Sequence, residues 1–342
     1  MENLTLEEIL KSLPKINEKR SYWFFRTNGG DFYENFIEGK YIAIGHNKVT
    51  LAHINQGNTK DASGVEILGN TIDNIYNNKN KKNDEEEKRP WYVASQLLKF
   101  TYSIKKGDIV FIPSANSHFI TFGEVQETPV YLDKAKDEFD CYFFKRKHVK
   151  WLKTLRRDEL DPNLYKLMFS HHTITEADSY AEHIDKILNS FFIKNNKAHL
   201  VLNVQTHKDI KAKDLFETGS ILLDLLDEFA AEEGLDYKSD DFSVKLNLQS
   251  PGVILLAGVS MGGILIIGLI IVGLAGGGFT FKYGKELSTG IKSDGIIEKI
   301  KSFLTSHSNT KVKKEILEKH MKDLEIKDPD DLVKILKELN KK

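Results

Sequence analysis

The run Val253–Ala275 reads VILLAGVSMGGILIIGLIIVGLA, and its 23 residues include no charged side chain and no Asn, Gln or His. A helix rises about 1.5 Å per residue and the hydrocarbon core of a bilayer is about 30 Å thick, so about 20 apolar residues suffice to cross it. The uncharged stretch covers residues 246–281 of a chain that is 29% charged as a whole. We therefore expect one transmembrane helix within residues 251–281 and a single-pass protein.

Glycine is dense in this stretch, since ten of the chain's 23 glycines lie in residues 252–284. Gly258 and Gly262 are four residues apart, and so are Gly273 and Gly277. Small residues at that spacing let helix backbones approach closely inside a membrane. The pattern predicts a helix that packs against copies of itself around a pore, with six small residues at the contact: Gly258, Ser260, Gly262, Gly268, Gly273 and Gly277.

Other interpretations of the same stretch stay open. It could be a plain membrane anchor, or a buried helix or a strand followed by a helix in a soluble core. Gly258-Val-Ser260-Met-Gly262 also matches G-x-S-x-G, the strand-to-helix turn that holds the nucleophile of α/β-hydrolases. Such a serine hydrolase would use Ser260 with Asp294 and with His307 or His320. The lack of any polar face in residues 264–274 favours the membrane helix.

The overall charge excludes some classes of protein. The chain has 342 residues with 49 basic and 50 acidic side chains, and a net charge of -1 does not fit a globally basic nucleic-acid binder. A single cysteine, Cys141, excludes an intramolecular disulfide scaffold. The start carries Glu2, Glu7 and Glu8 and lacks the basic and apolar regions of a signal peptide. We expect a cytosolic N-terminal part and a span in the inner (cytoplasmic) membrane. By the positive-inside rule, however, the basic flank at 282–292 would place the C-terminal side of the span inside, against a cytosolic N-terminal part.

Short apolar runs separated by turn residues predict a mixed α+β domain over about residues 18–170. SYWFFR (21–26) and YIAIG (41–45) predict strands, and GDIVFIPSANSHFITFGEV (107–125) predicts two strands with a turn at 114–117. Residues 141–149 predict a further strand. Its basic cluster, Lys145 to His148, is expected on a solvated strand face.

The order of four motifs resembles that of the PUA-like (EVE-like) domains of prokaryotic restriction and defence proteins. The motifs are R-x-N-x-G-x-F-x-x-x-F (26–36), YIAIG, GDIVFIPSANSHFITFGEV and FFKRKHVKWL (143–152). The resemblance covers about residues 20–170. It implies a small β-barrel with an aromatic-lined pocket that accepts a base or nucleotide by stacking and by hydrogen bonds to the base edge. The candidate ligand-binding residues are Trp23, Arg26, Asn28, Trp91, Tyr92, Ser114, Asn116, Ser117 and His118.

The rest of the chain divides into three parts. Residues 171–250 show alternating helix and strand patterns and predict an α/β connector before the apolar stretch. Residues 282–342 carry 15 basic and 11 acidic side chains and predict three short helices, a small module for self-assembly or for a partner. The predicted fold class is therefore α+β, with a PUA-like small β-barrel domain (1–170), a connector (171–250), one Gly-rich transmembrane helix (251–281) and a helical module (282–342).

Apart from the G-x-S-x-G match at Ser260, no motif points to a catalytic residue, a cofactor or a metal ion, since the sequence lacks a Walker loop, H-E-x-x-H and C-x-x-C. A base-reading domain, a connector and one span are similar in arrangement to membrane effectors of prokaryotic antiphage signalling, the Hailong and cyclic-oligonucleotide types. That resemblance implies a homo-oligomeric channel that a nucleotide or oligonucleotide messenger gates so that the host membrane is disrupted, with a nucleotidyltransferase as partner. A modified-DNA reader of a restriction-like system and the serine hydrolase are the alternatives.

Overall fold

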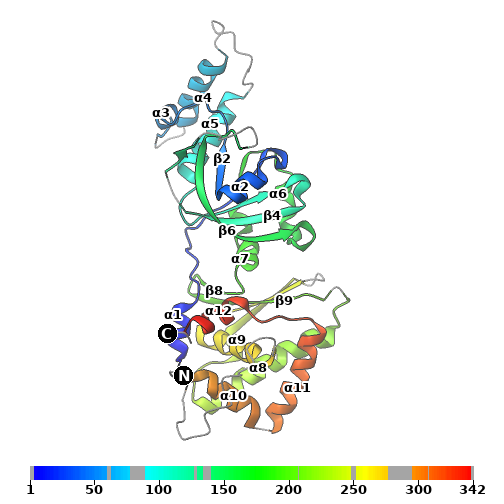
Figure 1. Cartoon of the computed structure of the whole chain (residues 1–342). Coiled ribbons are helices and arrows are strands. Elements are labelled where there is room, and N and C mark those ends of the chain that lie inside the picture. Colours follow the sequence, from blue (N-terminus) through cyan, green and yellow to red (C-terminus); the bar gives the residue numbers. More distant parts are fainter. Residues whose placement is uncertain are drawn as a thin grey trace. The chain divides into compact units, whose positions relative to one another are not determined.

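The chain folds into two compact units. The computed structural model describes residues 4–59, 63–77, 89–126, 129–133, 140–206, 208–247, 252–275, 295–306 and 308–339. Residues 19–188 form one unit, which we call the continuous unit. Residues 1–18 and 189–342 together form the other, which we call the discontinuous unit. Figure 1 labels the elements of both units, and each is described here by itself.

The continuous unit is built on a curled seven-stranded sheet with the order β2-β6-β4-β3-β1-β7, in which β5 also pairs with β6. β1 and β3 are parallel, and the other neighbours are antiparallel. The strands are β1 (Tyr22–Phe25), β2 (Tyr41–Ile44), β3 (Ile109–Pro113), β4 (Phe119–Val125), β5 (Tyr131–Leu132), β6 (Lys145–Arg156) and β7 (Ile174–Glu176).

Short helices surround this sheet. The helices α3, α4 and α5 gather at one end of the unit (Figure 1). The α-helices are α2 (Tyr33–Gly39), α3 (Leu51–Gln56), α4 (Ser63–Tyr76), α5 (Pro90–Leu98), α6 (Tyr165–Met168) and α7 (Ala181–Leu188). A π-helical turn, η2 (Lys99–Ser103), follows α5, and the 3₁₀ turns are η1 (Asn28–Gly30), η3 (Ala115–Ser117), η4 (Arg157–Glu159), η5 (Pro162–Leu164) and η6 (Asp178–Tyr180).

Both faces of the sheet are buried at β1, β2 and β3, which explains why these three strands are apolar throughout. All four residues of β1 are buried. Phe25 packs beside Phe100 in the core on one face, and Phe24 packs beside Phe111 in the core on the other. A strand covered on both faces reads as a continuous apolar run rather than as an alternation.

The discontinuous unit combines an antiparallel sheet of order β10-β11-β9-β8 with six α-helices among its described residues. The strands are β8 (Phe191–Lys194), β9 (Lys197–Val204), β10 (Phe242–Asn247) and β11 (Gly252–Gly258). The helices are α1 (Leu6–Ser12), α8 (Ala212–Glu233), α9 (Met261–Ala275), α10 (Ile296–Ser306), α11 (Ser308–Asp323) and α12 (Asp330–Leu339), and a 3₁₀ turn, η7 (Ser239–Asp241), precedes β10.

The predicted transmembrane helix within 251–281 is wrong. Gly252–Gly258 is the strand β11, and it is paired on both edges, with β9 and with β10. Only Met261–Ala275 is helical, and these 15 residues make α9 about 22 Å long at ~1.5 Å per residue. In the described part of the chain, none of the helices combines the length and the apolar character that crossing a bilayer requires.

The stretch is apolar on every side because the protein itself encloses it. Four consecutive residues of α9, 264–267, are fully buried, so a whole turn of the helix has no exposed face. α9 contacts the helices α1, α8, α10, α11 and α12 and the strand β9. A helix that is apolar all round is as typical of the centre of a globular core as of a membrane span.

Close packing inside the discontinuous unit explains why Gly258 and Gly262, the first two glycines of the predicted pore, have no side chain. A Cβ atom on Gly258 would overlap the ring of Phe242, and a Cβ atom on Gly262 would overlap Tyr237. Both aromatic residues belong to the same unit. These glycines therefore make room for aromatic side chains of this chain rather than for a second helix backbone.

The other predicted pore glycines lie along α9. A Cβ atom on Gly268 would lie 3.0 Å from Leu332, and one on Gly273 would lie 3.6 Å from Leu304. Gly268 is thus closely packed against α12, whereas Gly273 has room for a methyl group. Gly277 lies outside the described residues.

The division into units differs from the predicted domains. Residues of the predicted connector, span and helical module share one core, to which Leu200, Leu226, Ile267 and Leu332 all belong. The helix α1 joins this core through its buried Ile9. The first boundary falls after residue 188 rather than after 170, because α7 packs with the continuous unit. The three short helices expected in 282–342 are present as α10, α11 and α12.

Candidate functional site

Two loops of the continuous unit meet at one end of the sheet. Thr27 precedes η1, and its hydroxyl donates a hydrogen bond of 2.6 Å to the carbonyl of Pro113 at the end of β3. The turn η3 follows directly and packs against η1, and a Cβ atom on Gly30 would overlap the backbone of Ala115. Glycine at position 30 therefore allows the two loops to touch.

The backbone in both loops is left-handed at successive residues. In the first loop φ is 55° at Asn28 and 113° at Gly30, and in the second it is 53° at Asn116 and 55° at Ser117. A left-handed conformation costs a non-glycine residue roughly 1–2 kcal/mol, and asparagine tolerates it better than most. Such conformations persist where the surroundings fix them, and they cluster at binding sites.

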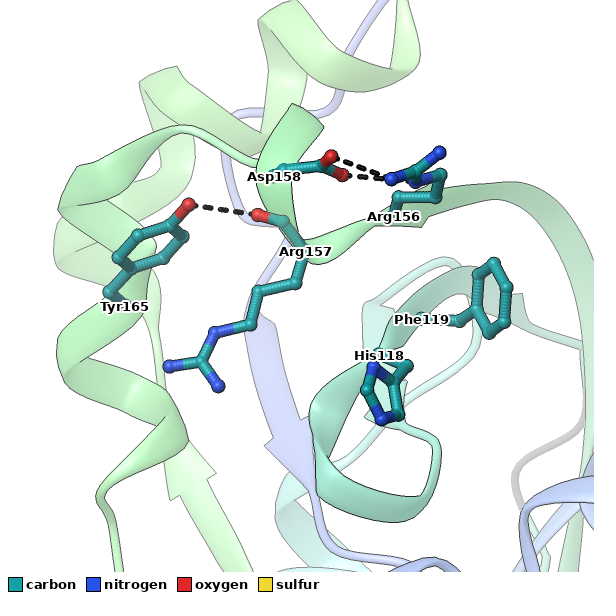
Figure 2. A pocket seen from close by; sticks show the side chains of 6 residues that line it. All are labelled: His118, Phe119, Arg156, Arg157, Asp158 and Tyr165. Carbon is teal, nitrogen blue, oxygen red and sulfur yellow. Dashed lines mark hydrogen bonds and ion pairs between the residues drawn. The ribbon is translucent and has the colours of Figure 1, made fainter.

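A hollow of about 560 Å³ lies beside the second loop and is lined by His118, Phe119, Arg156, Arg157, Asp158 and Tyr165 (Figure 2). His118 and Phe119 lead into β4, and Arg156 ends β6 directly opposite Phe119 in the strand register. The amide of Arg157 donates a 2.9 Å hydrogen bond to the carbonyl of His118. The pairing of β4 with β6 thus brings together residues that are almost 40 positions apart.

The hollow has an excess of positive charge. Arg156 makes a two-point ion pair with Asp158, with its Nε 3.1 Å from one carboxylate oxygen and an Nη 2.8 Å from the other. The guanidinium of Arg157 lies 5.7 Å from the ring centre of Tyr165, and no carboxylate among the described residues pairs with it. The hydroxyl of Tyr165 donates to the Arg157 carbonyl, which holds that ring in place (Figure 2).

An aromatic face is also available there. Phe119 is 46% exposed, although it is the first residue of a strand whose next residues are buried. An exposed ring beside guanidinium groups can stack with a planar ligand, while the guanidinium groups form paired hydrogen bonds with a phosphate or carboxylate. The hollow therefore suits an anionic ligand with a flat ring system.

Several predicted ligand residues lie at or near this place. His118 lines the hollow, and Asn28, Asn116 and Ser117 lie in the two loops that meet beside it. Ser114 closes its own turn, because its hydroxyl accepts a 2.9 Å hydrogen bond from the amide of Phe119. The structure therefore brings together the polar candidates of the two loops.

Other predicted residues belong to the framework. Trp23 is buried, and its indole donates a 3.0 Å hydrogen bond to Asp108. Arg26 donates to the carbonyls of Ser170 and Met168, which fastens the chain that follows α6. Neither side chain lines the hollow.

The aromatic pair on α5 also serves packing. Trp91 is 48% exposed, and its ring covers Gly69 of α4, where a Cβ atom would lie 2.5 Å from the indole. The hydroxyl of Tyr92 accepts a hydrogen bond from the amide of Thr173 before β7. Both residues belong to α5, which Figure 1 shows beside α3 and α4 at one end of the unit, and neither lines the hollow.

The residues that sequence reasoning missed are Phe119, Arg156, Arg157 and Tyr165. The pair Arg156-Arg157 lies beyond the strand that we expected at residues 141–149, whereas β6 continues to Arg156. The available signal was the alternation in residues 145–156, which is weak because this strand mixes buried and exposed residues. Only the strand register places the two arginines beside His118.

The solvated basic strand face expected at Lys145–His148 is wrong. Lys145 and Lys147 are 1% and 0% exposed, and their ammonium groups donate to backbone carbonyls. Arg146 is buried too and pairs with Asp133 and Asp140. Burial lowers the pKa of each lysine to about 8. These cations hold loops to the sheet, because they satisfy carbonyls that the strands do not use.

The residues of the hydrolase alternative are not assembled among the described residues. Asp294 and His307 lie outside them. The Ser260 hydroxyl is enclosed without a hydrogen-bond partner in the turn between β11 and α9, where a Cβ atom on Gly263 would lie 3.1 Å from it. His320 instead contacts carboxylates near the start of α8, whereas the chain beyond the end of α8 packs near Ser260.

Comparison with known proteins gives one match. A family model described as a domain of unknown function (DUF8426) matches residues 24–178. The matched range begins in β1, ends just after β7 and lies wholly within the continuous unit. No curated protein and no solved structure matches the chain. The resemblance to PUA-like domains stays a prediction.

Proposed function

We propose that the continuous unit binds a nucleotide or a short oligonucleotide in the hollow beside the 114–118 loop. The observation that carries the proposal is Arg157, whose guanidinium faces the hollow without a carboxylate partner among the described residues. A planar cation with several donors suits a phosphate oxygen pair, and the bond is stronger because both groups are charged.

The neighbouring groups support the same class of ligand. The exposed ring of Phe119 can stack with a base, and His118 adds ring nitrogens to the same wall. The volume of about 560 Å³ falls within the roughly 300–1,000 Å³ range of small-ligand sites. The polar loop residues Asn28 and Asn116 supply donors and acceptors for a base edge close by.

The proposal concerns the binding step alone. The predicted pore depended on a transmembrane helix at 251–281. The described part of that segment, residues 252–275, is instead a strand and a helix of 15 residues. Antiphage defence, a homo-oligomer and a nucleotidyltransferase partner stay predictions from the resemblance.

A binding measurement with one matched variant tests the proposal. Isothermal titration of the full chain with cyclic dinucleotides, linear dinucleotides and short single-stranded oligonucleotides should show binding by at least one class. Arg157→Gln should weaken that binding roughly 10-fold to 100-fold, since a hydrogen bond between charged groups contributes about 1.5–3 kcal/mol. Lys106→Gln is the control, because this exposed lysine precedes β3 at the end of the strand away from the 114–118 loop.

Two outcomes would count against the proposal. One is the absence of binding with all three ligand classes at submillimolar concentration. The other is an affinity of the Arg157→Gln variant equal to that of the wild type. A modified duplex that binds while the three classes do not would favour the DNA-reader alternative.

A further inference from the structure

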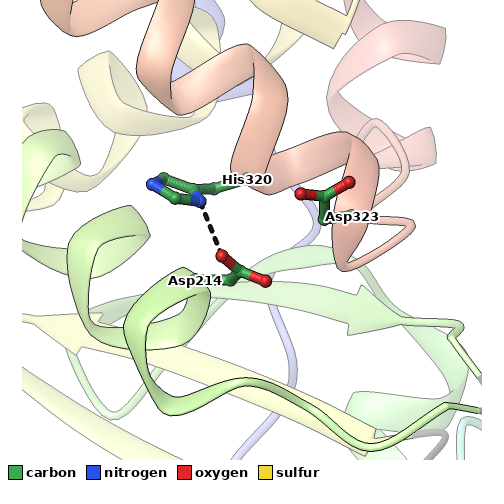
Figure 3. Close-up of side chains that lie close together, drawn as sticks. All are labelled: Asp214, His320 and Asp323. Carbon is green, nitrogen blue, oxygen red and sulfur yellow. Dashed lines mark hydrogen bonds and ion pairs between the residues drawn. The ribbon is translucent and has the colours of Figure 1, made fainter.

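The discontinuous unit holds a second cluster of polar side chains, where α8 and α11 pack together. Asp214 and Glu217 are three residues apart on α8, and His320 and Asp323 are three residues apart on α11. Residues at that spacing share a helix face, so each helix directs two side chains to the same place. Asp214, His320 and Asp323 each offer one possible ligand atom, and these three atoms lie within 4.8 Å of one another (Figure 3).

The imidazole of His320 is fixed at both nitrogens. Nδ1 lies 2.9 Å from an oxygen of Asp214, and Nε2 lies 2.7 Å from an oxygen of Glu217. The ring is 5% exposed and Asp214 is 8% exposed, so both groups are held away from solvent. A histidine that ligates a metal usually donates its other ring N–H to a carboxylate, which sets the tautomer and the ring orientation. Glu217 occupies that second position.

The third carboxylate of the cluster, that of Asp323, has no partner among the described residues that would balance its charge. Asp323 ends α11, where the helix dipole disfavours negative charge. No hydrogen bond or ion pair of its carboxylate is present within the part of the chain that the structure describes. The ammonium group of Lys213 lies 3.6 Å from a carboxylate oxygen of Glu217 and so balances the charge of Glu217. The carboxylates of Asp214 and Asp323 therefore lie close together beside His320, with their negative charges incompletely balanced.

We propose that this cluster binds one divalent transition-metal ion, with Nδ1 of His320 and the carboxylates of Asp214 and Asp323 as ligands and Glu217 as a positioning residue. One imidazole with carboxylates suits Zn²⁺, Mn²⁺ or Fe²⁺. Ligand atoms of a tetrahedral zinc ion with bonds of ~2.0–2.1 Å are about 3.3 Å apart. The separation of Nδ1 and Asp214 is already close to that value, and the exposed Asp323 side chain can rotate to meet it.

Such a site is independent of the proposed nucleotide site, because it lies in the other unit. The metal would cross-link α8 to α11 through Asp214 and His320, which are 106 positions apart in the chain. Water would complete the coordination on the exposed side, next to Asp323. A metal ion there would both stabilise the unit and present a polarised water molecule to solvent.

Metal titration of the full chain tests the proposal. After treatment with a chelator, isothermal titration with Zn²⁺ and with Mn²⁺ should show one bound ion per chain and a raised Tm with the ion that binds. Asp323→Asn removes a ligand at an exposed position and should weaken binding at least 10-fold while the metal-free protein melts as the wild type does. His320→Gln should abolish stoichiometric binding. Asp224→Asn is the control, since Asp224 lies on the same helix and pairs with Lys313 of α11.

A spectroscopic readout distinguishes this site from adventitious surface binding. Co²⁺ in a site with one imidazole and carboxylates should give visible d–d absorption that Asp323→Asn alters and Asp224→Asn does not. The proposal is overturned if the wild type binds neither Zn²⁺ nor Mn²⁺ stoichiometrically, or if Asp323→Asn and His320→Gln bind the ion as tightly as the wild type. In that event the four side chains form only a charged contact between two helices.

Discussion

At the scale of single residues, the most unusual groups are the two buried lysines of β6. Lys145 donates to the carbonyls of His46 and Val49, and Lys147 donates to those of Thr101 and Ile104. Neither makes a salt bridge with a carboxylate among the described residues, so hydrogen bonds to carbonyls are the main compensation for the loss of hydration. For Lys147, the charge of Asp108 and the ring of Phe100 add to it. Desolvation by burial disfavours the charged form and lowers the pKa of each to about 8.

These pKa values predict that stability rises with pH between about 8 and 10. The unfolded chain, with lysine pKa values of 10.5, holds more protons in this window than the folded chain, so the free energy of unfolding increases as pH rises. The gain should be roughly 2 kcal/mol per lysine. The raised pKa values of Cys141, Tyr22 and Tyr41 act in the opposite direction, the thiol from about pH 9 and the two tyrosines mainly above pH 10, so the rise is measured relative to the double variant, which keeps all three groups.

Urea unfolding at several pH values checks this prediction. A Lys145→Met, Lys147→Met double variant should lose most of the increase, because it has no proton to release in that window. Lys106→Met, which removes an exposed lysine of the same unit, should keep the wild-type slope. A wild type whose stability is flat or falls between pH 8 and 10 relative to the double variant would contradict the prediction.

At the scale of elements, β11 and α9 show how glycine serves a globular core. The strand turns into the helix within two residues, and Tyr237 and Phe242 fill the space above Gly262 and Gly258. The bulky residues and the glycines are therefore complementary parts of one packing arrangement. Adding even a methyl group at such a position forces either the backbone or the aromatic ring to move.

This arrangement predicts opposite effects of two glycine-to-alanine substitutions. Gly262→Ala should destabilise the protein by about 1–3 kcal/mol, since the new methyl group overlaps Tyr237. Gly219→Ala in α8 should stabilise it by about 0.5–1 kcal/mol, because no atom lies within 4 Å of the new Cβ and alanine favours the helix. Chemical unfolding of the two variants measures both effects.

A second substitution shows whether the clash is the cause. The double variant Gly262→Ala, Tyr237→Ala should be less destabilised than the sum of its two single variants, since removing the ring makes room for the methyl group. Additive losses would show that Tyr237 is not what limits residue 262.

At the scale of the whole molecule, the discontinuous unit depends on a segment that is remote in sequence. The helix α1 begins with a capping box in which Thr5 and Glu8 satisfy each other's backbone amides, and Ile9 lies fully buried in the common core. Ile193 receives a backbone hydrogen bond from Ile16, which ties the segment to β8. The first residues of the chain are thus structural members of its last unit.

A substitution of Ile9 should therefore destabilise elements that lie far from it in the sequence. Ile9→Ala should cost about 2–5 kcal/mol, because it leaves a cavity in the core. Hydrogen exchange should show lost protection in residues 189–339 and unchanged protection in residues 19–188. Leu10→Ala is a milder control on the same helix, since Leu10 is only partly buried. Loss of protection in both units would show that they do not unfold separately.

How much the sequence could predict depends on the range of the contacts involved. Local patterns were enough for β1, β2 and the three C-terminal helices, because each is defined by nearby apolar and turn residues. The run Val253–Ala275 was assigned wrongly to a membrane helix, because the missing polar face that favoured a span is equally typical of a helix at the centre of a globular core. The site residues Arg156 and Arg157 required the pairing of β4 with β6, which composition does not encode.

The division of the discontinuous unit into two chain segments also sets the order in which the two units can fold during synthesis. When residues 1–18 leave the ribosome, the helices and strands that will cover Ile9 have not yet been made. The continuous unit has all its partners by residue 188, so it can fold while α1 remains exposed. At roughly 5–20 residues per second, the 170 residues of the continuous unit take about 10–35 s to add. Until those partners are made, the apolar face of this amphipathic segment stays uncovered, and exposed apolar surface of this kind is what chaperones protect from aggregation.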